Sequence, residues 1–169
     1  MNTVNHNRRF IMSWLKGIAL LLLASFTQAA ELEVHDHKSR DIENMPIPKI
    51  EIALARDAMD GVNLHVELQN YNMGSPSNAG AQNNQWLSGH AHLFINGVKQ
   101  QRLYATDVHI PAHWLKPGVN QIAVSLNSHQ HENWTHSAKT IVGSVFFNPE
   151  ADNLILHQYS SQPIAATFR

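Results

Sequence analysis

Residues 89–97 read GHAHLFING and carry the clearest structural signal in the chain. Successive side chains of a β-strand point to opposite faces, so alternate positions form one apolar face, made of Ala91, Leu93 and Ile95. The Asn96-Gly97 pair is typical of a two-residue hairpin turn, because both central residues of a type I′ turn need positive φ. The stretch therefore predicts a strand over 90–95, a tight turn and a partner strand over 98–105.

Alternating apolar and polar residues recur along the chain, which predicts further strands over 50–54, 62–68, 120–127 and 140–147. The segment 154–159 is either a last strand or part of a tail. Residues 72–84 and 128–139 are polar and predict loops. With turn residues between the strands and no helical periodicity, the pattern predicts an all-β fold, an antiparallel β-sandwich of about seven strands.

The chain divides into four segments. Residues 1–29 have a basic start, an apolar run of about half a membrane span and small residues before position 30, as a cleaved secretory signal does. Residues 30–48 are polar and broken by prolines, which predicts a flexible arm. The predicted β-sandwich covers 49–148, and 149–169 forms a C-terminal tail or extra strand. We therefore expect a periplasmic or secreted protein with no stable membrane span after cleavage.

Charge and cysteine content exclude several classes of function. Removing the signal takes away three basic residues and no acidic one, so the net charge falls from −1 to about −4. Nucleic acid is therefore not an expected partner. The chain has no cysteine, which excludes disulfides, thiolate zinc sites and iron–sulfur clusters.

Six of the twelve histidines form three His-x-His pairs, of which one lies in the predicted arm over 30–48 and two lie in or next to predicted strands. His90 and His92 lie in a predicted strand, and His129 and His131 follow the strand over 120–127. Residues i and i+2 of a strand point the same way, so each pair can direct two imidazoles at one spot. Neutral imidazole is a ligand for copper, zinc, nickel and iron. Both pairs belong to the face opposite the apolar one, so two adjacent strands would bring up to four imidazoles together.

Other side chains are candidates near such a site. His109 alternates with apolar residues and is a further possible ligand. Arg102 and Tyr104 share one face of the predicted partner strand, and they either orient an imidazole and bind an anionic group or form a stacked surface pair. Met73 is either a soft ligand for Cu(I) or a core residue. An apolar shell around the ligands could come from Trp86, Phe94 and Trp134.

Several motifs together resemble a group of poorly characterised bacterial exported proteins with the approximate pattern GHAHLYVNGxKxxRLY…H[LI]P…PGxNxIxVxLNxxxH. The matching parts lie within residues 50–147 and include GHAHLFING, RLY, HIP and LN with a histidine four residues beyond its asparagine. That group resembles immunoglobulin-like or cupredoxin-like β-sandwiches. The resemblance implies a functional set of His90, His92, His109 and His131 and leaves His129 outside it. The Asp107-Val108 pair departs from the aromatic residues expected there.

We therefore expect a protein that binds a transition metal through His90, His92, His109 and His131, for metal buffering, delivery or resistance. An all-imidazole site without carboxylate or thiolate favours copper by affinity order, with zinc second. Two alternatives remain: an immunoglobulin-like envelope interaction module without metal, which would bind an envelope protein, and a histidine-ligated metalloenzyme. The common hydrolase, zinc-protease and phosphate-loop motifs are absent from the sequence, so we predict no catalytic residues.

Overall fold

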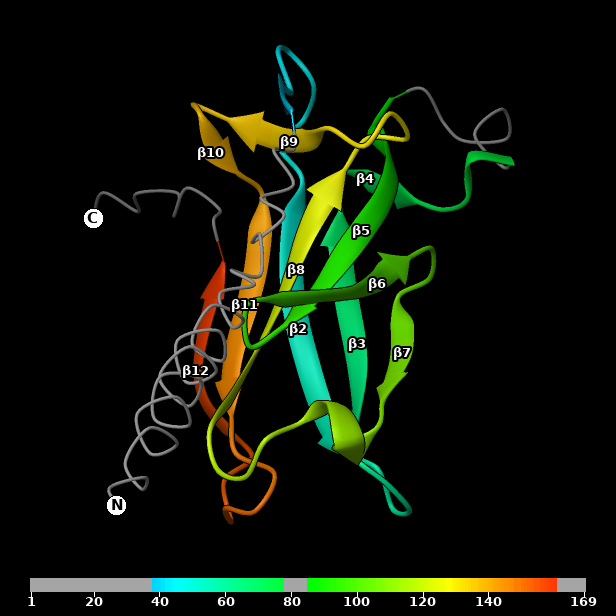
Figure 1. The fold of residues 1–169 in the computed structure, drawn as a ribbon. Coiled ribbons are helices and arrows are strands. Elements are labelled where there is room, and N and C mark those ends of the chain that lie inside the picture. The colour runs from blue at the N-terminus through cyan, green and yellow to red at the C-terminus, as the bar shows by residue number, and fades with distance from the viewer. Residues whose placement is uncertain (1–37, 78–84, 161–169) are drawn as a thin grey trace, which may run out of the picture. The chain divides into compact units, whose positions relative to one another are not determined.

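The computed structural model describes residues 38–77 and 85–160, which form twelve strands in two sheets (Figure 1). The chain is all-β, as predicted, although its strands are shorter and more numerous than the seven expected. The predicted signal over 1–29 lies outside the described residues. Among the residues that the structure describes, no helix has the length and apolar character needed to cross a membrane.

The smaller sheet has three antiparallel strands in the order β2-β3-β7: β2 (Lys49–Arg56), β3 (Val62–Gln69) and β7 (Asp107–Ile110). Its strands alternate as the sequence predicts. Ile50, Ile52 and Leu64 point into the core, whereas the side chains between them are exposed. The alternation fixes the pairing of the strands, because a slip by one residue would turn every apolar side chain outward.

The larger sheet has nine strands, and its main path is β1-β9-β8-β11-β12. These strands are β1 (Ser39–Asp41), β9 (Asn133–His136), β8 (Asn120–Asn127), β11 (Val142–Phe147) and β12 (Ile155–Ser160). β5 pairs with β8, β6 and β4, and β10 pairs with β9; their bounds are β4 (Tyr71–Met73), β5 (Leu87–Ile95), β6 (Val98–Leu103) and β10 (Lys139–Thr140). The turn from β5 to β6 is the predicted one, with φ of +51° at Asn96 and +82° at Gly97.

The two sheets pack their apolar faces together. The position where a Cβ of Gly143 in β11 would stand lies 3.2 Å from the side chain of Ile50 and 3.4 Å from that of Ile52, both in β2. Side chains of β12 also donate hydrogen bonds to β2: Gln158 Nε2 to the Ile52 carbonyl at 2.8 Å and Ser160 Oγ to the Ile50 carbonyl at 3.1 Å. The arrangement is an all-β sandwich with one core.

Three segments carry more structure than the sequence predicts. β9 and β10 lie within the predicted loop over 128–139, where Trp134 and Thr135 are buried. β4 lies at the start of the predicted loop over 72–84. In the predicted arm, β1 runs parallel to β9, and Ile42 directly after it is 2% exposed. The segment left open as strand or tail forms β12, at one edge of the larger sheet. The loop before β9 carries His131.

Candidate metal centre

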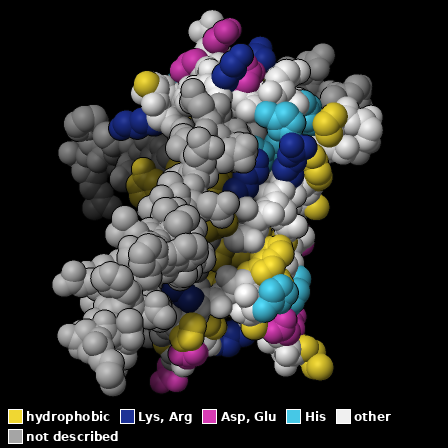
Figure 2. All heavy atoms as spheres, viewed as in Figure 1, with side chains coloured by type: hydrophobic (Ala, Val, Ile, Leu, Met, Phe, Trp, Pro, Cys, Tyr) yellow, Lys and Arg dark blue, Asp and Glu magenta, His cyan; other side chains and the backbone are white. Residues whose placement is uncertain are grey.

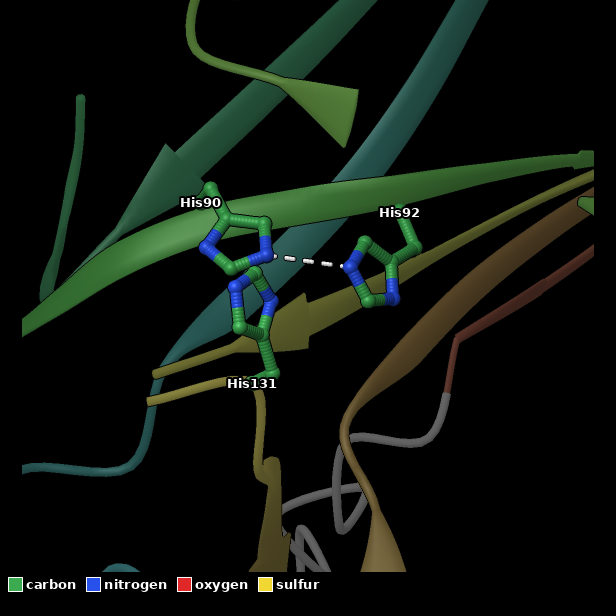
Figure 3. A group of neighbouring side chains, drawn as sticks. All are labelled: His90, His92 and His131. Carbon is green, nitrogen blue, oxygen red and sulfur yellow. Dashed lines mark hydrogen bonds between the residues drawn. The ribbon is translucent and has the colours of Figure 1, made fainter. Parts of the chain in front are cut away.

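Three imidazoles from two distant parts of the chain converge at one end of the larger sheet. His90 and His92 come from β5, and His131 comes from the loop after β8 (Figure 3). The Nε2 atoms of His90 and His92 are 3.0 Å apart, and one ligand nitrogen of each of the three residues lies within 4.8 Å of the others. The structure thus brings together three of the four residues that the sequence predicts as metal ligands.

The spacing of these nitrogens is close to that of a metal site. Metal–imidazole bonds of about 2.0–2.1 Å separate tetrahedral ligand nitrogens by about 3.3 Å and allow no pair beyond about 4.2 Å. The pair His90 and His92 is close to this spacing, and a pair at 4.8 Å would have to close by about 1.5 Å to reach the tetrahedral spacing. His90 and His92 are 1% and 0% exposed and held by packing. His131 is exposed, so its ring is the one that can make the movement.

The pairing of β5 with β8 positions the two buried histidines. His90 lies opposite Asn127 and His92 opposite Ser125, so all four side chains share one face of the sheet. The Tyr71 hydroxyl lies 3.0 Å from the His90 carbonyl oxygen and 2.8 Å from that of Asn127, and it joins the two strands just beside the site. The backbone at His90 is therefore held by its pairing with β8 and by the Tyr71 hydroxyl.

A tight loop between β8 and β9 presents His131. The Ser128 N–H donates to the Glu132 carbonyl at 2.8 Å, and the His131 N–H donates to the Ser128 carbonyl at 3.0 Å. At the ends of the loop, Asn127 Nδ2 donates to Asn133 Oδ1 at 2.6 Å. His131 has φ of +67°, in the left-handed region that few residues except glycine adopt, although histidine enters it more often than most. The loop thus fixes the backbone position from which the third imidazole extends.

The buried site keeps His90 neutral. Burial is the main cause, and electrostatic interaction with His131, Arg102, His129 and Lys99 adds to it, so that the pKa of His90 is lowered from 6.5 to about 4. A neutral imidazole has a lone pair for a metal ion. His90 Nδ1 is also buried and has no hydrogen-bond partner among the described residues. A buried polar atom without a partner is destabilising, and such atoms often mark a functional site.

The contact between His90 and His92 depends on protonation. With the two Nε2 atoms 3.0 Å apart, one ring donates Nε2–H and the other accepts through its lone pair. A metal ion needs a lone pair on each nitrogen that it binds. Metal binding would therefore replace this hydrogen bond and move or release its proton, as is general for histidine ligands.

Aromatic rings and a fourth histidine surround the cluster. The ring of Tyr104 lies 5.8 Å from that of His90, and the ring of Phe94 lies 6.4 Å from that of His92. His129, which the resemblance leaves out, has its ring 6.4 Å from that of His90, and neither of its buried ring nitrogens has a partner among the described residues. The doubled His-x-His spacing was the sequence signal that pointed to His129.

His109, the fourth predicted ligand, is not among the residues whose nitrogens converge. It lies on β7 in the smaller sheet, where its Nδ1 is 3.1 Å from Asn63 Oδ1 and its Nε2 is 4.0 Å from Asp60 Oδ2. Its side chain is 46% exposed. The chain leaves the larger sheet after β6 and joins β3, which carries His109 to a different sheet from the other three histidines.

Of the residues predicted to surround the metal ligands, some lie beside the cluster and others lie elsewhere. Phe94 lies beside the cluster, as expected. Trp134 is buried, with the Arg40 guanidinium 5.3 Å from its ring, and Trp86 is 41% exposed. Met73 lies on β4 opposite Gly89 and packs against the core, which agrees with its interpretation as a core residue.

No protein-family model, no curated protein and no solved structure matches the chain. The fold and the site show an all-β protein with a cluster of three histidines, two of them buried, that could hold a metal ion.

Proposed function

We propose that this chain is an exported metal-binding protein of the cell envelope, which holds copper through His90, His92 and His131. The observation that carries the proposal is the convergence of three imidazole nitrogens within 4.8 Å, two of them from fully buried rings. Histidines without a binding role usually face water. A buried imidazole is destabilising unless its ring nitrogens have partners, and a metal ion would be such a partner.

The choice of copper rests on the ligand type. The group contains imidazole only, with neither carboxylate nor thiolate. Magnesium and calcium prefer oxygen ligands, whereas an imidazole site follows the affinity order in which Cu²⁺ exceeds Zn²⁺. Zinc is therefore the second choice. The role in the cell would be buffering, delivery or resistance, and export follows from the signal-like sequence over 1–29.

Metal analysis of the untagged protein after copper loading and desalting tests the proposal. We expect about one tightly bound equivalent, a Cu²⁺ electron paramagnetic resonance signal with nitrogen couplings, and loss of both in a His90→Ala/His92→Ala variant. A matched control is His65→Ala/His157→Ala, which removes two exposed histidines from β3 and β12. Binding well below one equivalent, or equal binding by the two double variants, would contradict the proposal. Competition between copper and zinc decides the preferred metal.

Three protein ligands are also the arrangement of many catalytic metal centres, in which a further position holds water or substrate. The exposure of His131 favours such an opening. A metalloenzyme is therefore the second candidate function. It requires turnover of a substrate by the copper- or zinc-loaded protein that disappears in the His131→Asn variant.

A further inference from the structure

Two basic side chains flank the histidine cluster. Arg102 in β6 lies directly opposite His92 in β5, and cross-strand partners of an antiparallel pair point to the same face. Lys99, in the same strand, lies opposite Phe94. The charges of both residues act on His90, because each contributes to the lowering of its pKa. Figure 2 shows Lys and Arg side chains next to histidines in the upper part of this face.

In the described part of the chain, no acidic side chain neutralises these charges. Among the described residues, no carboxylate pairs with Arg102 or Lys99, and none belongs to the histidine group. The acidic residue in the loop, Glu132, accepts from Ser128 Oγ at 3.2 Å and pairs with Arg40 at 3.5 Å. A divalent ion on three neutral imidazoles would therefore stand beside two further positive charges without a compensating negative one, an arrangement that Coulomb repulsion disfavours.

We infer that the metal-loaded site takes a small carboxylate or inorganic oxyanion as an additional ligand, bound to the metal and held by Arg102 and Lys99. The inference rests on the proposed function. Guanidinium binds carboxylate and oxyanions through paired N–H donors, and the lysine ammonium adds a point charge. Tyr104 supplies a further donor, since its ring lies beside His90 and its side chain is 42% exposed.

One side of the cluster is accessible to solvent. His90 and His92 are buried, but His131, Arg102 and Tyr104 are all exposed. Three protein ligands leave at least one position of a copper or zinc ion unfilled. These exposed residues lie next to the buried pair, so a small anion can approach the cluster from solvent. The anion would balance the charge and complete the coordination in one step.

Azide titration of the copper-loaded full chain tests the inference, because azide bound to Cu²⁺ gives an absorption band of its own. We expect saturable binding of azide and its displacement by acetate or phosphate. In an Arg102→Gln/Lys99→Gln variant, the Kd for azide and both competitors should rise at least tenfold, while the copper stoichiometry stays the same. The charge-matched control is Lys49→Gln/Lys116→Gln, which removes two positive charges from β2 and from the loop after η2 (Ala112–Trp114) and should leave the Kd unchanged.

One single variant separates charge from geometry. Arg102→Lys keeps the charge but loses the paired donors, so it should weaken acetate and phosphate more than azide. Equal anion affinity in the parent and the double variant overturns the inference and leaves the copper site intact. Anion binding of equal strength without copper also overturns it, since the ligand would then need no metal. A chain that binds no copper fails before any anion is added, and that result removes the proposed function itself.

Discussion

Gly89 lies so close to Asn127 that a Cβ at Gly89 would stand 1.9 Å from the Asn127 carbonyl oxygen and 2.6 Å from the Tyr71 hydroxyl. Only glycine allows β5 and β8 to approach this closely just before His90. We expect Gly89→Ala to push the strands apart, to lower the free energy of unfolding by about 3 kcal/mol and to weaken copper binding. Urea unfolding and copper stoichiometry measure the two effects. Ser88→Ala, one residue earlier in β5, is the control, and equal behaviour of the two variants would refute the role of Gly89.

Asn127 connects the site to the loop that carries His131. It lies opposite His90, accepts from Ser125 Oγ at 2.9 Å and donates to Asn133 Oδ1 at 2.6 Å. Asn127→Ala removes the hydrogen-bond partner of Ser125 Oγ and of Asn133 Oδ1. Because these atoms lie in a buried or partly buried environment, we expect the free energy of unfolding to fall by about 1–3 kcal/mol.

The same change should lower copper affinity, because it removes the hydrogen bond that joins the two ends of the loop carrying His131. A double-mutant cycle with Asn133→Ala measures the coupling. Since both changes break one hydrogen bond, the double variant should be less destabilised than the two single effects added. Strict additivity would mean that this hydrogen bond contributes nothing.

The left-handed backbone of His131 allows its imidazole to be removed without disturbing the loop. Asparagine adopts positive φ readily, so we expect His131→Asn to change the free energy of unfolding by less than about 0.5 kcal/mol and yet to weaken copper binding at least tenfold. His131→Val, a β-branched residue at φ +67°, should destabilise the fold as well. Chemical unfolding and isothermal titration with copper measure both variants. Full copper affinity in His131→Asn would exclude this residue as a ligand.

The local part of this structure was predictable from the sequence, because its causes are local. Alternation placed His90 and His92 on one face, and Asn96-Gly97 specified the turn after them. Neither signal shows what covers that face. The two histidines are buried because distant segments lie over them: the loop with His131 and the ring of Tyr104.

The parts that sequence reasoning could not fix depend on long-range pairing. Alternation around His109 predicts a strand but not the sheet that it joins, and β7 pairs with β3 rather than with β5. β9 is short and mostly polar in sequence, and it becomes a strand because β1 and β8 pair with it. A motif pattern leaves out His129, whereas the fold places its ring beside His90. Residue spacing therefore indicated histidine as the ligand type and β5 as one strand of the site. The pairing of the strands decides which other histidines lie beside it.

The low pKa of His90 makes the stability of the metal-free fold depend on pH. Folding lowers this pKa from 6.5 to about 4, so between these values the unfolded chain binds more protons than the folded one. The free energy of unfolding must then rise with pH across this window and fall as the solution becomes acidic. A shift of this size corresponds to on the order of 3 kcal/mol, fully present above about pH 6.5 and lost near pH 4.

Urea unfolding of the protein in chelator, repeated from about pH 4 to about pH 7, measures this dependence. His90→Gln should flatten the profile because it removes the titrating group, whereas His157→Gln on exposed β12 should leave the profile unchanged. The same low pKa bears on copper, since protons compete with the metal for His90 only near pH 4. An equally steep profile in His90→Gln would assign the pH dependence to other groups. It would also contradict the conclusion that burial lowers the pKa of His90.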